Sequence, residues 1–201
     1  MTSSMSRRSL FAATGAVLAI GLTACASSDT LAKQAAAGDS KGFVAGDGSV
    51  TEYAPAKRSA PVEFSGKLFD GSTVTAAGLR GKVTVLNFWY AACSPCREEA
   101  PELQALHVEF EPQGVDFYGV NIRDEVATAE AFERSYKLTY PSIMDKDGGV
   151  LLALSKRNLV PPAAVPTTLV LDKQGSVSAR ILGPADKGTL KALITSALAE
   201  K

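Results

Sequence analysis

The chain has 201 residues, of which 46% are hydrophobic and 21% are charged. This length and composition suit one globular domain of roughly 100–150 residues together with non-globular segments. Lys plus Arg and Asp plus Glu both number 21, so the formal net charge is zero. Because no excess of positive charge exists to hold a nucleic acid or an acidic polymer, we expect neither as a partner.

The N-terminal segment has the pattern of an export signal. Arg7 and Arg8 precede an apolar stretch over 10–22, which is shorter than the ~20 residues that a membrane-spanning helix needs. The letters LTAC at 22–25 resemble a bacterial lipobox, in which the cysteine is lipid-modified after the signal is removed. We therefore predict a signal peptide over 1–25 and a lipid anchor at Cys25, on the extracytoplasmic face of a bacterial cell membrane. Secretion without an anchor is the alternative.

Residues 26–60 are rich in Ala, Ser, Gly, Asp and Lys and show no sustained period of 2 or 3.6. This composition predicts a flexible tether. As a random coil it would span roughly 30–35 Å, enough to hold a domain near a membrane but clear of it. The globular domain is predicted over 61–201.

The predicted domain opens with a hairpin and a central strand. The turn signal Asp70-Gly71 separates two short strand-like runs in 62–82, which indicates an N-terminal β-hairpin. The letters VTVLNFW at 83–89 are nearly all apolar, with β-branched and aromatic residues. Such a run is typical of a strand that is covered on both faces.

The next elements alternate between helix and strand. Apolar residues at helical spacing predict a helix over 94–111, with acidic residues in its early turns. The letters VDFYGVN at 115–121 predict a strand, and 127–137 a second helix. This β-α-β-α order is typical of parallel strands with helical crossovers.

The remaining elements are shorter. We predict a strand at 142–145, a helix over 150–156 and an antiparallel hairpin within 167–182. A closing helix follows, with Asp186 as its N-cap and an apolar face that includes Leu190 and Ile194. The fold class predicted is therefore α/β, a mixed β-sheet flanked by helices with an N-terminal hairpin extension.

Cys93 and Cys96 lie three positions apart at the predicted strand-to-helix junction. A helix N-terminus favours a thiolate over a thiol, so this spacing suits a reactive dithiol. A tetrahedral zinc site would need four ligands, but the domain offers only these cysteines and His107. Haem attachment would need a His where Arg97 stands. A structural disulfide over so short a loop would constrain the unfolded chain little, and redox catalysis is favoured. No metal or other cofactor is expected.

The stretch FWYAACSPC at 88–96, Pro101 in the helix and the downstream letters VPTT at 165–168 together resemble the thioredoxin fold. Within that fold they resemble the membrane-tethered TlpA/ResA/DsbE-like thiol-disulfide oxidoreductases of bacteria. The resemblance covers about residues 61–200 and is specific for fold and chemistry, but less so for substrate.

The resemblance implies roles for several residues. Cys93 would be the exposed nucleophile and Cys96 the buried resolving thiol, with Pro95 in the usual spacer position. Pro166 would form a cis bond facing the dithiol, so that a substrate strand pairs with the backbone of Val165.

Trp89 would be either a core residue or a wall of the substrate site. Asn87 stands where thioredoxins carry a buried Asp, which it cannot replace in proton transfer. Glu99 matches an acidic residue of the tethered subfamily and would accept the proton of Cys96 if it is buried. The alternative for Glu99 is a solvated side chain that complements the helix dipole. His107 is expected at the surface.

From this resemblance we expect the chain to be an extracytoplasmic thiol-disulfide oxidoreductase that reduces protein disulfides, for example in cytochrome c maturation. The resemblance implies protein thiol and disulfide substrates, a membrane-embedded electron donor and a monomeric state. Alternatives are a dithiol oxidase, a peroxiredoxin-like antioxidant or an inert tethered binding module. The peroxiredoxin signature needs Thr where Tyr90 stands.

Overall fold

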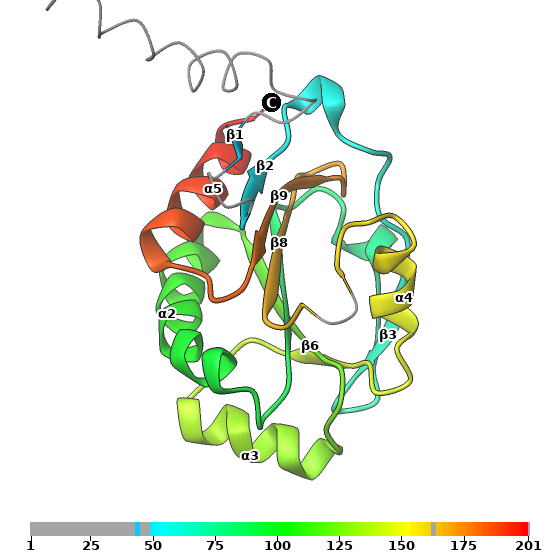
Figure 1. Ribbon diagram of the computed structural model, residues 1–201, viewed down its shortest axis with the longest axis vertical. Helices are drawn as coiled ribbons and strands as arrows, with labels where there is room; N and C mark the ends of the chain where they lie inside the picture. The colour runs from blue at the N-terminus through cyan, green and yellow to red at the C-terminus, as the bar shows by residue number, and fades with distance from the viewer. Residues whose placement is uncertain (1–42, 45–48, 162–163, 201) are drawn as a thin grey trace, which may run out of the picture. The chain divides into compact units, whose positions relative to one another are not determined.

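The computed structural model describes residues 43–44, 49–161 and 164–200 (Figure 1). The chain divides into two units, 1–38 and 39–201, and every described residue belongs to the second. The predicted signal peptide, the predicted lipidation site Cys25 and the first part of the predicted tether lie outside the described residues.

A single mixed sheet of nine strands runs through the described part, in the order β1-β2-β9-β8-β5-β6-β7-β3-β4. Its central strand β5 pairs parallel with β6 and antiparallel with β8. The strands are β1 (Phe43–Val44), β2 (Val50–Glu52), β3 (Ser65–Leu68), β4 (Thr73–Thr75), β5 (Thr84–Trp89), β6 (Asp116–Asn121), β7 (Ser142–Met144), β8 (Thr167–Leu171) and β9 (Val177–Leu182).

Helices cover both faces of this sheet, which confirms the predicted α/β thioredoxin-like class. Figure 1 shows α2 and α5 together on one side of the sheet and α4 on the other. The helices are α2 (Ser94–Phe110), α3 (Val126–Tyr136), α4 (Gly149–Ser155) and α5 (Lys187–Ala199), with short 3-10 turns η1 (Pro55–Lys57), η2 (Ala76–Leu79) and η3 (Glu111–Gln113).

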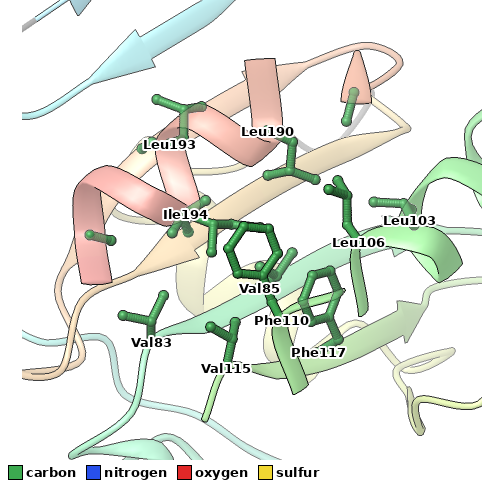
Figure 2. Close-up of a cluster of buried hydrophobic side chains, with 14 of the residues drawn as sticks. Val83, Val85, Leu103, Leu106, Phe110, Val115, Phe117, Leu190, Leu193 and Ile194 are labelled. Carbon is green, nitrogen blue, oxygen red and sulfur yellow. The ribbon is translucent and has the colours of Figure 1, made fainter. Parts of the chain in front are cut away.

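All six residues of β5 are buried, as the apolar run predicts. Side chains alternate between the faces of a strand, so Val85 joins the hydrophobic cluster under α2 and α5, while Leu86 and Phe88 join the cluster under α4. Figure 2 shows the first cluster, in which side chains from the sheet meet those of α2 and α5. The labelled members include Val83, Val85, Leu103, Leu106, Phe110, Phe117, Leu190 and Ile194.

The predicted N-terminal hairpin is confirmed as β3 and β4, which pair antiparallel. Oδ1 of Asp70 accepts a hydrogen bond from the Ser72 amide at 2.8 Å. Gly71 takes a φ of 84°, in the left-handed region that glycine enters without steric cost. Because β3 also pairs with β7, the hairpin extends one edge of the sheet.

The folded domain begins earlier than the predicted boundary at residue 61. Strand β2 lies in the range assigned to the tether, yet it pairs antiparallel with β9. Arg58, whose side chain is 5% exposed, forms salt bridges with Asp172 and Glu200. Asp172 follows β8 and Glu200 caps α5, so these contacts fasten residues 50–60 to the domain. A three-residue strand carries too little periodicity to be read from sequence.

Candidate functional site

The two cysteines lie where β5 gives way to α2, as predicted. Cys93 is the N-cap of α2, and its Sγ accepts a hydrogen bond from the Cys96 amide at 3.2 Å. The two residues form a disulfide with their Cα atoms 5.3 Å apart. At this position the unpaired amides and the dipole of α2 stabilise negative charge on Sγ of Cys93 after reduction.

Both cysteines are buried in this oxidised form, which corrects the expectation that Cys93 is exposed. The exposed fraction is 3% for Cys93 and 2% for Cys96. The half-buried Tyr90, Ala91 and Val165 pack against the buried cluster that contains both cysteines. Cover from a loop distant in sequence could not be read from the local motif.

Trp89 lies beneath the disulfide and is 3% exposed. Its ring packs on Phe132 of α3, with ring centroids 4.4 Å apart. Both residues belong to the buried cluster that contains the two cysteines. Of the two interpretations of Trp89, this position favours the core residue.

The bond between Val165 and Pro166 is cis, which confirms the prediction. The Val165 side chain packs against the cysteine cluster. The Pro166 carbonyl accepts a hydrogen bond from the Gly183 amide at 2.9 Å. Among the described residues no backbone hydrogen bond involves the N–H or C=O of Val165.

Pro95 occupies the first turn of α2 and is half-buried. A proline is tolerated there because the amide it lacks would have no partner inside the helix. Cys96 and Glu99 lie on α2, and Cys93 is its N-cap. The helix continues through Pro101 as far as Phe110.

Glu99 is 2% exposed, which decides between the two interpretations of this residue in favour of burial. Its Oε1 accepts a hydrogen bond from Nδ2 of Asn87 at 2.7 Å, and its Oε2 from the Ala185 amide at 2.7 Å. Burial raises the pKa of Glu99 to about 7, and the two hydrogen bonds oppose this rise. The carboxyl group can therefore both hold and release a proton near neutral pH.

A small cavity of about 10 Å³ borders Cys96 and Asn87. This volume is close to the least that holds one water. Because Asn87 also donates a hydrogen bond to Glu99, the cavity places a space of water size next to both Cys96 and the partner of the buried carboxyl group. Its lining is Asn87, Trp89, Cys96, Ala100, Leu103, Phe132, Leu138 and Tyr140.

Asp124 supports the loop before Cys93, and sequence reasoning missed it. Its Oδ2 accepts hydrogen bonds from the Ala91 amide at 2.6 Å and from Nδ2 of Asn121 at 2.8 Å. In the same loop, the guanidinium of Arg123 lies 4.0 Å from the ring centroid of Tyr90. Its position in the sequence could have indicated this role. Strand β6 is parallel and adjacent to β5, so residues that follow β6 lie at the same edge of the sheet as the cysteine loop.

His107 is buried, at 8% exposure, and the expectation of a surface residue is wrong. It lies four residues after Leu103, on the stripe of α2 that faces the sheet. Its ring lies 5.5 Å, centroid to centroid, from the rings of Phe117 and Tyr140. Burial lowers the pKa of His107, so packing favours the neutral ring.

In the described part of the chain, no three side chains of His, Cys, Asp or Glu gather as a metal site would require. The helices described there include none with the length and apolar character needed to cross a bilayer.

Residues 57–180 match the sequence profile of the AhpC/TSA family. The thiol-disulfide oxidoreductase ResA of Geobacillus thermodenitrificans is 34% identical over 112 residues, which are 56% of this chain and 61% of that protein. The chain thus spans about three fifths of the length of the curated relatives it matches.

Two solved structures resemble the chain over more of its length. A DsbF homologue from Corynebacterium diphtheriae is 32% identical with a TM-score of 0.65, over 77% of this chain and 96% of that one. A secreted thiol-disulfide isomerase from Corynebacterium glutamicum is 28% identical with a TM-score of 0.69, over 79% of this chain and 97% of that one.

Proposed function

The chain belongs to the AhpC/TSA family. Given this family and the geometry of its dithiol, we propose that the chain is a thiol-disulfide oxidoreductase. The observation that carries the proposal is the Cys93–Cys96 disulfide at the start of α2, with a buried carboxyl group on the same helix. The names of its relatives support the same activity.

The reaction begins when the Cys93 thiolate attacks one sulfur of a substrate disulfide, forming a mixed disulfide and releasing the other substrate sulfur as a thiolate, which takes up a proton. Cys96 then loses its proton and attacks Sγ of Cys93, which expels the second substrate thiolate. The substrate gains two electrons and two protons, and the protein is left with the Cys93–Cys96 disulfide.

Glu99 is the proton acceptor that we assign to the second step. Cys96 must become a thiolate inside the protein, where solvent does not reach it readily. A carboxylate with a pKa of about 7 is poised to take such a proton at neutral pH. Support comes from the cavity of water size that Cys96 and Asn87 both line, since Asn87 donates a hydrogen bond to Glu99.

The substrate is expected to bind over Val165 and along an open groove of about 490 Å³ beside the dithiol loop. Val165 offers backbone groups that have no partner among the described residues, and Pro95 and Pro166 flank the same site. The groove lies between the start of α2 and α3 and offers cationic, aromatic and small side chains. Its lining includes Ala91, Arg97, Thr128, Phe132 and Tyr136.

We further propose the reducing direction, outside the cytoplasm, with Cys25 as a lipid anchor. In this direction a membrane-embedded thiol-disulfide donor reduces Cys93–Cys96, and the domain passes the electrons to protein disulfides such as those of apocytochromes c. Support comes from the resemblance of the CSPC and VPTT motifs to the tethered subfamily, and from the export signal in the sequence.

The activity is tested with single cysteine variants in a disulfide-exchange assay. Cys93→Ser should abolish exchange, whereas Cys96→Ser should accumulate mixed disulfides that mass spectrometry can identify. Cys25→Ser is the matched control and should keep full exchange activity. Full activity in Cys93→Ser would refute the assignment.

The direction is tested by the reduction potential of the Cys93–Cys96 couple. A catalytic couple should lie above about −300 mV, whereas an inert structural bridge should lie below it. A potential near that of thioredoxin, about −270 mV, supports reduction, and one near −120 mV indicates an oxidase. Thiol-dependent consumption of peroxide would instead support the antioxidant alternative.

A further inference from the structure

A second pocket is lined by residues of the segment after β2, the turn after α4 and strand β9, and neither cysteine of the disulfide is among them. Its volume is about 370 Å³, within the range of small-molecule sites. Three of its side chains are cationic and none is acidic. The lining residues are Tyr53, Lys57, Ser59, Arg157, Asn158, Leu159, Val177 and Arg180.

Neither arginine of this pocket forms a salt bridge with a carboxylate among the described residues. Arg157 donates instead to the backbone carbonyls of Ala60 and Pro61. Arg180 donates through Nη1 to the Asn158 carbonyl at 3.0 Å, and its Nε is buried without a partner in the described part of the chain. Backbone carbonyls therefore hold both guanidinium groups in place without neutralising them.

Most of the donors of these guanidinium groups have no partner among the described residues. Each guanidinium has five N–H groups, and the contacts above use two from Arg157 and one from Arg180. The nearby acid Glu52 accepts a hydrogen bond from Ser196 of α5, on the other face of the sheet. The pocket thus concentrates positive charge in a protein whose net charge is zero.

We propose that this pocket binds a small organic anion through a phosphate group. Two guanidinium groups and the ammonium of Lys57 match the charge and the oxygen atoms of a phosphate. Tyr53, Leu159 and Val177 supply an apolar wall for the organic part. Two sources share this chemistry, a soluble phosphate ester and the headgroup of an anionic phospholipid.

The test uses the full chain with Cys25→Ser, which removes the predicted lipidation site, in a phosphate-free buffer. Phenyl phosphate is titrated by calorimetry, and vesicles of phosphatidylglycerol or phosphatidylcholine are tested by co-sedimentation. Arg180→Gln should weaken binding at least about tenfold, because a charge-assisted contact is lost. Lys156→Gln is the matched control: it removes one exposed positive charge next to the pocket lining and should change affinity less than about twofold.

Saturable 1:1 binding of phenyl phosphate that depends on Arg180 assigns a soluble ester. Binding to phosphatidylglycerol vesicles alone, with the same dependence, assigns the lipid headgroup. If Arg180→Gln fails to fold, Lys57→Gln changes an exposed side chain and should weaken binding about threefold. The proposal is overturned if neither probe binds at about 10 mM, or if the pocket variants and Lys156→Gln weaken binding equally.

Discussion

Nδ2 of Asn87 donates a hydrogen bond to Oε1 of Glu99 at 2.7 Å, between two buried side chains. The same Nδ2 also donates to Oγ1 of Thr168 at 3.1 Å. Asn87 belongs to β5, Glu99 to α2, and Thr168 to β8, just after the cis proline. One amide therefore connects the three elements that surround the disulfide.

The first prediction concerns the pH dependence of stability. The pKa of Glu99 is raised from 4.5 to about 7 on folding, so between these values the folded state binds more protons than the unfolded state. Stability should therefore fall as pH rises from about 4.5 to 7, by up to roughly 3 kcal/mol. Glu99→Gln should remove this fall and be the more stable protein at pH 8. Urea unfolding of the oxidised protein between pH 5 and 8 measures both effects.

Glu98→Gln is the matched control, because Glu98 is the exposed neighbour on the same helix. Its stability should follow the wild-type pH dependence. An equal flattening of the curve in both variants would contradict the assignment to Glu99. In the exchange assay, Glu99→Gln should also slow the resolving step by about 10²-fold or more, since a positioned base contributes that much.

The second prediction separates the two hydrogen bonds of Asn87. Asn87→Ala removes a donor that favours the ionised carboxyl group, so the pKa of Glu99 should rise above 7 and stability at pH 8 should fall by about 1–3 kcal/mol. Thr168→Val leaves the contact between Asn87 and Glu99 in place and should not move the midpoint. Urea unfolding at a series of pH values gives the pH at which half of the change in unfolding free energy has occurred. A shift of this midpoint in Thr168→Val but not in Asn87→Ala would contradict the role assigned to the Asn87–Glu99 hydrogen bond.

The third prediction compares two arginine salt bridges of different burial. Arg58→Ala leaves the nearly buried Asp172 without its cationic partner and should cost about 3 kcal/mol. Arg80→Ala breaks the exposed pair with Glu63 and should cost less than about 1 kcal/mol. Urea unfolding at neutral pH gives the loss of unfolding free energy in each variant. Equal losses would show that burial does not make the salt bridges of Arg58 more important for stability than the exposed pair.

The fourth prediction concerns Gly119 of β6, beneath Trp89. A Cβ there would lie 2.2 Å from Oγ of Ser142 and 2.6 Å from Nε1 of Trp89, so Gly119→Ala should cost about 1–3 kcal/mol. Trp89 is the only tryptophan of the chain, so its fluorescence should report the displacement directly. Gly149→Ala, where the nearest atom is 3.8 Å away, should leave the spectrum unchanged.

The sequence predicted those parts of the fold that local chemistry determines. The apolar run of β5, the N-cap Asp186 and the turn at Asp70 depend on near neighbours, and the structure has them where the patterns place them. The cysteine spacing likewise located the start of α2 to the residue.

The remaining features depend on contacts between residues far apart in the chain. Ala185, which donates to Glu99, lies 86 residues away. Strand β2 pairs with β9, which lies more than 120 residues further along the chain. Val165 packs against the cluster that contains Cys93, and no local pattern records that packing. His107, expected at the surface, is buried, although its place four residues after Leu103 on α2 is a local signal for burial.

The cluster of Arg58, Asp172 and Glu200 also bears on how the domain withstands a mechanical pull on its N-terminal end. A pull on residues before β2 would first load the hydrogen bonds between β2 and β9 and the salt bridges of Arg58. Residues 61–92 separate these contacts from the disulfide along the chain. The edge of the sheet therefore resists such a pull first, and the disulfide at the start of α2 lies further along the chain.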